Sequence, residues 1–162
     1  MKTILAAIDF SGTTDLVIAE AVALARAMSG KVLLVTVLVE PIFLPEYAPP
    51  VRSIAKITVS EEKSVHERLT SIRQKLRAAG VSADFVVCRG STSLNILKVA
   101  QKSKAAFIVI GARGHSALFE LILGSTTQAV LKDAQQPVLI IPAKMKAPRN
   151  KKARKSPAKV KA

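Results

Sequence analysis

Five short, largely apolar runs divide the first 142 residues of the chain. They cover residues 3–8, 31–38, 83–88, 107–110 and 138–141. Apolar residues follow one another within these runs instead of alternating with polar ones. Continuous apolar runs are typical of strands covered on both faces of a parallel sheet, whereas a strand with one wet face alternates. The pattern therefore predicts five buried β-strands.

Helical patterns fill the segments between the runs. Apolar residues at helical spacing predict a helix that follows the first strand, and we predict Gly30 as its C′ residue. Thr58 and Glu61 have the spacing of a capping box, which predicts the start of a long amphipathic helix ending at Gly80. Two further helices are predicted, one after Gly90 and one over residues 125–133.

The predicted order alternates strand and helix from end to end. Such alternation predicts an α/β fold, with an open parallel sheet, helices on both of its faces and right-handed crossovers. Ligands bind such sheets beyond the carboxyl ends of the strands, where the strand order reverses. Asp9 follows the first run and Gly111 follows the fourth. If these two strands are neighbours, both residues face one crevice.

A glycine loop separates the fourth run from the last helix, with the spacing G-x2-G-x9-G-S. Bare backbone can approach an anion at its first turn, and the unpaired amides and dipole of the helix start favour negative charge. The loop contains neither a Walker A sequence nor the dinucleotide fingerprint G-x-G-x-x-G. We therefore predict a phosphate site made by Gly111, Arg113, Gly114, Gly124, Ser125 and Thr126.

The loop spacing resembles the ATP-binding signature of the universal stress protein family. Three further stretches resemble strands of that family: ILAAIDFS at 4–11, FIVIGARG at 107–114 and QPVLIIP at 136–142. The resemblance covers residues 1–143. It implies a Rossmann-like, five-stranded parallel sheet of order 3-2-1-4-5, a homodimer, and ATP bound at the switch point between strands one and four.

The resemblance also implies roles for single residues. Asp9 corresponds to the family's acidic residue near the nucleotide and its metal, and Val37 corresponds to a residue lining the adenine pocket. The six residues of the loop and helix start correspond to phosphate and ribose contacts. The expected cofactor is ATP, with Mg²⁺ at Asp9. In the simpler interpretation, Asp9 only caps the first helix or its turn and the glycines only make turns. Ser125 is predicted to be an N-cap, a role that is compatible with a phosphate contact.

Three classes of function stay open at this point. The first is a regulatory ATP-binding module with at most slow hydrolysis, because we find no assigned base and no catalytic triad. The second is an enzyme of the adenine-nucleotide α-hydrolase type. Ser11-Gly12 of this chain matches the pyrophosphate loop of such enzymes, S-G-G-x-D-S, only in part, because the second glycine is missing. The third is a nucleic-acid-associated protein that acts through its C-terminal tail.

Composition adds this tail to the picture. The 162 residues are 49% hydrophobic but only 4% aromatic, which predicts an aliphatic core. Of the 25 basic residues, nine lie in residues 144–162, which hold no acid; the net charge of +14 thus falls to +5 for the rest. A segment so poor in large apolar side chains is not expected to fold. We predict a domain over residues 1–143 and a disordered tail that binds nucleic acid, another polyanion or no partner.

Several predictions concern the setting of the protein. Cys88 is the one cysteine, no apolar run reaches the roughly 18 residues of a membrane span, and the N-terminus meets Asp9 too early for a signal peptide. These features favour a cytoplasmic protein without a transmembrane segment. Residues 40–57 hold four prolines and are predicted to form a long loop, for which a lid function stays open.

The last predicted strand is also a predicted dimer contact. Residues 137–142, bounded by Pro137 and Pro142, are strongly apolar and come at the end of the strand order. An uncovered apolar edge invites pairing with another strand. We therefore expect a homodimer through this strand.

Overall fold

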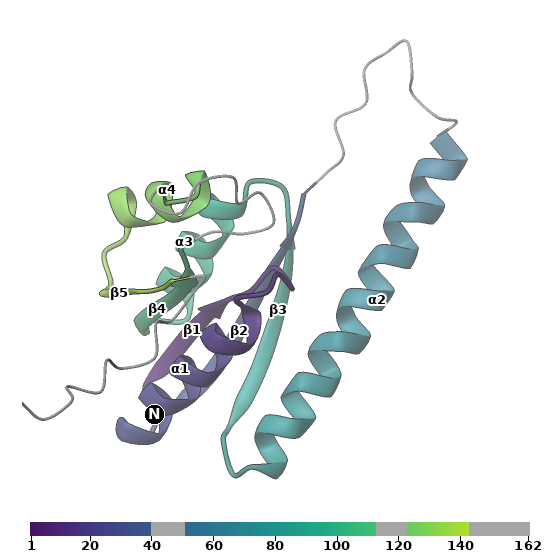
Figure 1. The fold of residues 1–162 in the computed structure, drawn as a ribbon. Coiled ribbons are helices and arrows are strands. Elements are labelled where there is room, and N and C mark those ends of the chain that lie inside the picture. Colours follow the sequence, from purple (N-terminus) through teal and green to yellow (C-terminus); the bar gives the residue numbers. More distant parts are fainter. Residues whose placement is uncertain (40–50, 113–122, 143–162) are drawn as a thin grey trace, which may run out of the picture.

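A computed structural model describes residues 1–39, 51–112 and 123–142 of the chain, with the side chains of all of these except residues 51–58. Strands and helices alternate throughout (Figure 1). The strands are β1 (Thr3–Ala7), β2 (Lys31–Leu38), β3 (Ala83–Arg89), β4 (Ala105–Gly111) and β5 (Val138–Ile141). The helices are α1 (Thr14–Ala27), α2 (Val51–Ala78), α3 (Thr92–Lys102) and α4 (Ser125–Asp133).

The five strands form one sheet in the order β3-β2-β1-β4-β5, and every neighbouring pair is parallel. The predicted fold class and strand order are confirmed. β1 lies at the centre, where Ile4 pairs with Val32 of β2 and with Phe107 of β4. The order reverses between β1 and β4, so the carboxyl ends of these two strands define the place where a ligand is expected.

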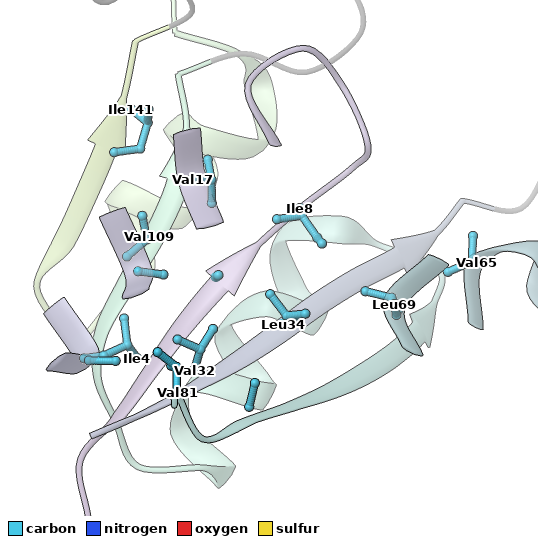
Figure 2. Packing of buried hydrophobic residues seen from close by; sticks show 14 of the residues in the cluster. Ile4, Ile8, Val17, Val32, Leu34, Val65, Leu69, Val81, Val109 and Ile141 are labelled. Atoms are coloured by element: carbon cyan, nitrogen blue, oxygen red, sulfur yellow. The ribbon is translucent and has the colours of Figure 1, made fainter. Parts of the chain in front are cut away.

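Side chains of the sheet alternate between two hydrophobic cores. Ile4 of β1 belongs to the cluster on one face, which also contains Val17 of α1 and Leu69 of α2 (Figure 2). Leu5, the next residue, packs with α3 and α4 on the other face. All five residues of β1 are buried. Burying a side chain such as that of Ile4 or Leu5 stabilises the fold by about 1.5–3 kcal/mol, which explains why this strand is apolar after Thr3.

The prediction for the end of α1 is wrong. The left-handed residue after the helix is Ser29, with φ 48°, and not Gly30. Gly30 is small for another reason, because a Cβ there would lie 2.5 Å from the carbonyl oxygen of Lys2. The neighbouring Lys31 N–H donates to that same carbonyl at 2.8 Å. Gly30 therefore permits a close approach of two backbone segments at the amino end of the sheet.

The predicted start of α2 is also wrong. The helix begins at Val51, so Thr58 lies inside it and is not its N-cap. The sequence holds no glycine or proline between Val51 and Gly80, and thus nothing stops the helix from beginning directly after the proline pair at 49–50. The loop predicted for residues 40–57 is shorter than expected, and its remaining part, with the lid function, lies outside the described residues.

An ion pair joins α2 to the carboxyl end of β3. Arg89 donates a hydrogen bond to the carboxylate of Glu62, and this bond and the charge of Arg89 hold the pKa of Glu62 below its ordinary value. Both side chains are partly exposed, so the pair is expected to add little to stability. Of the four helices that the structure describes, none has the length and apolar character needed to cross a bilayer.

Candidate functional site

A cavity of about 300 Å³ opens at the carboxyl edge of the sheet, around the point where the strand order reverses. Its volume is at the lower end of the range of small-molecule pockets. The ends of β1, β2 and β4 and the first residues of α1, α3 and α4 line it. The lining residues are Ala7, Ile8, Asp9, Thr13, Thr14, Val17, Val35, Val37, Val39, Thr92, Ile96, Ile110, Gly111, Gly124, Ser125, Thr126 and Thr127.

Six of the residues predicted to form the site come together at this cavity, from four separate parts of the chain. They are Asp9, Val37, Gly111, Gly124, Ser125 and Thr126. Arg113 and Gly114 lie outside the described residues, so their place in the site stays a prediction. The ligand contacts of the other six are likewise predictions, but their convergence supplies the geometry that such contacts require.

Hydrogen bonds fix the start of α4 beside the end of β4. The N–H of Gly124 donates to the carbonyl of Ala112 at 2.8 Å, and the N–H of Ala112 donates to the carbonyl of Ile141 at 2.7 Å. The Thr127 hydroxyl donates to the carbonyl of Gly111 at 2.8 Å. The two ends of the glycine loop are therefore held together. Because the Gly124 amide is used within the protein, the amides that α4 can offer a ligand begin at Ser125.

The interpretation of Ser125 as an N-cap is wrong. The N-cap of α4 is Gly124, in an extended conformation with φ −62° and ψ 152°, and Ser125 is the first helical residue. Glycine has no side chain with which to cap, and no side-chain hydrogen bond caps this helix. The first amides of a helix have no acceptor within it. α4 thus begins with donors directed at the carboxyl edge of the sheet, where Ser125 and Thr126 line the cavity.

Two other helices also begin at this cavity. Thr13 is the N-cap of α1 and Ser91 is the N-cap of α3, and in neither case does a side-chain hydrogen bond cap the helix. Thr14 and Thr92, the first helical residues, line the cavity together with the start of α4. Three positive helix ends therefore converge on one space. Among the described lining residues, Asp9 is the one with a formal charge.

Asp9 lies in the turn between β1 and α1. Its carboxylate oxygen Oδ1 accepts a hydrogen bond from the N–H of Ser11 at 3.0 Å. Phe10, between them, has the left-handed φ of 60°, which is unusual for a bulky residue. The guanidinium of Arg68 on α2 lies 3.8 Å from the centre of the Phe10 ring. The carboxylate thus stabilises a tight turn that holds it at the mouth of the cavity.

The strand end before this turn is fixed as well. The N–H of Ile8 donates to the carbonyl of Val35 at 2.9 Å, and the buried hydroxyl of Thr36 donates to the carbonyl of Ile8 at 3.1 Å. Both hydrogen-bonding groups of the Ile8 backbone are therefore paired with β2. The position of Asp9 follows from this pairing, because it is the next residue along the chain.

The cavity has a polar part and an apolar part. Hydroxyls and amides gather at the helix starts. The apolar part is formed by Val37 of β2, Val39 directly after that strand, Ile96 of α3 and Ile110 of β4. Val39 is 65% exposed, so this apolar wall reaches the solvent. Small-molecule sites commonly combine an apolar wall with a few polar groups that fix orientation. A ligand with a flat apolar ring and an anionic group matches both parts.

The sequence prediction missed several lining residues. Thr13, Thr14 and Thr92 stand where helices begin, and the sequence prediction did not include them in the site. The signal that identifies them is positional: in a parallel α/β sheet every helix that follows a strand begins at the carboxyl edge. Which of these helix starts meet depends on strand order, and that order cannot be obtained from hydrophobic periodicity.

The predicted metal has a limited set of ligands here. No group of three or more His, Cys, Asp and Glu side chains that could hold a metal ion occurs among the described residues. Asp9 provides one carboxylate at the cavity. Magnesium is commonly held by one or two carboxylates together with substrate phosphates and water. The residues fit a magnesium ion that arrives with a phosphorylated ligand, and do not form a cage of their own.

The sequence of this chain is similar to those of known proteins. The family model described as "Universal stress protein family" matches residues 1–142. Universal stress protein Sll1388 of Synechocystis sp. is 29% identical over 147 residues, which cover 85% of this chain and 96% of the relative. Universal stress protein MJ0577 of Methanocaldococcus jannaschii is 29% identical over 77 residues, and that match spans only 48% of each chain.

Solved structures share the fold. That of protein MJ0577 has a TM-score of 0.76 at 24% identity and covers 87% of this chain and 95% of its own. A universal stress protein solved with cAMP has a TM-score of 0.59 at 21% identity, and the match covers 88% of this chain and 98% of that protein. The Archaeoglobus fulgidus universal stress protein solved with dAMP has a TM-score of 0.62 at 21% identity, and the match covers 87% of this chain and 97% of that protein. The family match spans all nine elements of the sheet and its helices, and the chain belongs to the universal stress protein family.

Proposed function

We propose that this chain binds an adenine nucleotide, ATP foremost, in the cavity at the carboxyl edge of the sheet. The observation that carries the proposal is the convergence of three uncapped helix starts and an apolar wall on one cavity. Two proteins of similar fold were solved with adenine nucleotides, cAMP in one and dAMP in the other. Each of these ligands has an adenine ring, which suits the apolar wall of this cavity, and a phosphate group, which suits the helix starts.

In the proposed complex the phosphates lie at the start of α4. The free amides of Ser125 and Thr126 suit phosphate oxygens, because the helix dipole adds to their hydrogen bonds. The adenine ring lies against Val37 and its neighbours on the apolar wall. Arg113 and Gly114 complete the phosphate contacts in this proposal, on the strength of the sequence motif.

Asp9 is the proposed contact for a magnesium ion that accompanies the nucleotide. The ion would offset the negative charge of the phosphates beside the carboxylate. Without it, the Asp9 carboxylate would repel a phosphate placed close to it. ATP binding is therefore expected to strengthen when Mg²⁺ is added.

The features of the site favour binding over rapid catalysis. Amides, hydroxyls and an apolar wall hold a ligand, and their geometry is fixed by the sheet. We propose a regulatory module whose nucleotide-bound and nucleotide-free states differ in partner binding. An enzyme of the α-hydrolase type is the alternative, and the products of incubation with ATP distinguish the two.

Mass spectrometry of the purified protein tests this proposal. Under native conditions we expect a bound mass equal to ATP or another adenine nucleotide, one per chain. Incubation with ATP should leave most of it intact. Release of AMP and pyrophosphate at a steady rate would favour the enzyme instead, and failure to retain or take up any adenine nucleotide would contradict the proposal.

We also propose partners outside the cavity. β5 is an edge strand of the sheet, which supports a homodimer through residues 137–142. Residues 144–162 lie outside the described residues, and their charge supports binding of nucleic acid or another polyanion. Deletion of residues 144–162 should abolish DNA retention on a native gel at low salt. Unchanged retention would rule the tail out as the binding segment.

A further inference from the structure

Thr14 differs from the other hydroxyl-bearing residues at the cavity. It is the first residue of α1, it is among the residues that line the cavity, and it is 8% exposed. Within the described part of the chain, its hydroxyl is the one buried side-chain polar atom without a hydrogen-bond partner. An unpaired buried hydroxyl destabilises a fold, and native structures rarely retain one.

Neighbouring hydroxyls are hydrogen-bonded within the protein. The Thr13 hydroxyl lies 3.0 Å from that of Ser11. Thr127 donates to the carbonyl of Gly111, and Thr36 donates to that of Ile8. These three hydroxyls therefore have structural roles that account for their presence. No such hydrogen bond accounts for Thr14, although it also lines the cavity.

The position of Thr14 suits an anionic oxygen. α1 and α4 cover opposite faces of the sheet, and their first residues line the cavity from both sides. The dipole of α1 favours negative charge at Thr14, as the dipole of α4 does at Ser125. A hydroxyl can donate to a phosphate oxygen, which carries no proton of its own at neutral pH.

We infer that the Thr14 hydroxyl donates a hydrogen bond to a phosphate oxygen of the bound ligand, opposite the start of α4. This inference rests on the proposed function and goes beyond it by assigning a phosphate contact to α1. Thr14 then acts as a specificity-determining residue that separates phosphorylated ligands from the free nucleoside. The phosphate group is held from two helix starts, one on each face of the sheet.

The inference predicts effects of opposite sign for one substitution. Thr14→Val keeps the shape of the side chain and removes the hydroxyl. The ligand-free protein should become more stable, with its Tm raised by about 2–4 °C, because a buried unpaired group is lost. Affinity for ATP should fall by about 10- to 100-fold, the usual effect of losing a hydrogen bond to a charged group.

Calorimetric titration with ATP and with adenosine, combined with thermal unfolding, tests this for wild type, Thr14→Val and Thr14→Ser. Thr14→Ser retains the hydroxyl and should bind ATP within about threefold of wild type. Adenosine affinity should be equal in all three proteins, because adenosine has no phosphate.

The outcomes separate the two proposals. If wild type does not bind ATP, the proposed function fails and this inference fails with it. If wild type binds ATP and Thr14→Val binds it equally well, only the inference fails. A lower Tm for Thr14→Val would also overturn it, because the hydroxyl would then stabilise the fold. Equal losses for ATP and adenosine would overturn the assignment to phosphate.

Discussion

At the scale of single residues, both ends of β1 depend on backbone contacts that particular side chains allow. At the carboxyl end, the Thr36 hydroxyl donates a hydrogen bond to the carbonyl of Ile8 and thereby positions Asp9 at the cavity. At the amino end, Gly30 lets the chain pass close to Lys2. The two residues act in different ways, one by adding a hydrogen bond and the other by lacking a side chain.

Gly30→Ala should destabilise the protein by about 1–3 kcal/mol, because the new Cβ meets a backbone oxygen that cannot move without shifting β1. Urea unfolding measures this loss. Gly12→Ala is the matched control, since no atom lies within 4 Å of a Cβ at Gly12. We expect the control to stay within about 0.5 kcal/mol of wild type. Equal stability of the two variants would contradict the close approach at Gly30.

At the scale of elements, strands were more predictable than helix ends. β2 was predicted over its observed range, because a strand buried on both faces leaves a continuous apolar run. Helix ends are set by local competition between several residues. Ser29 takes the left-handed conformation although Gly30 is adjacent, and α2 runs through Thr58 because no glycine or proline lies between Val51 and Thr58.

The candidate site was predictable in part for related reasons. Asp9 and Gly111 were placed together because both follow strands that were expected to be neighbours. Thr14 could not be identified, because its significance depends on a missing hydrogen-bond partner that only a three-dimensional structure reveals. The glycine motif pointed to α4 alone, whereas the cavity also includes the starts of α1 and α3.

The start of α2 gives a prediction at this scale. Thr58→Ala should leave the free energy of unfolding unchanged or raise it by up to about 0.7 kcal/mol, because alanine is the better residue inside a helix. If Thr58 were the N-cap, the same change would cost about 1 kcal/mol. Ser60→Ala on the same helix is the control for the general effect of alanine. If urea unfolding shows a lower free energy of unfolding for Thr58→Ala but not for Ser60→Ala, the helix begins at Thr58 as the sequence predicted, and not at Val51.

At the scale of the whole molecule, the sheet order explains how distant segments build one site and why β5 forms one of the two edges of the sheet. β1 and β4 meet at the centre and bring the helix starts together, while β5 is left at the margin. The carbonyls of Pro137 and Ile141 accept hydrogen bonds from the β4 side. In a parallel pair alternate residues face the neighbour, so the backbone of Ile140 faces outward at the edge.

Ile140→Pro should therefore convert the proposed dimer to monomers, because proline removes an outward N–H while sparing the hydrogen bonds to β4. Light scattering measures the mass, and circular dichroism verifies that the sheet is retained. Ile140→Val keeps the N–H and should remain dimeric. A folded Ile140→Pro protein with the mass of a dimer would exclude pairing through this edge.

The proposed adenine nucleotide occupies the cavity where the three helix starts meet. Calorimetric titration of ATP with Mg²⁺ into wild type, Val37→Trp and Val59→Trp tests this proposal most directly. Val37 lines the apolar wall, so tryptophan there should fill the space for the adenine ring. Val59 is 67% exposed on α2 and does not line the cavity, so its variant controls for the added bulk. We predict one site per chain in wild type and Val59→Trp, with affinity at least about 100-fold weaker in Val37→Trp. No binding by wild type, or equal binding by all three proteins, would contradict the account.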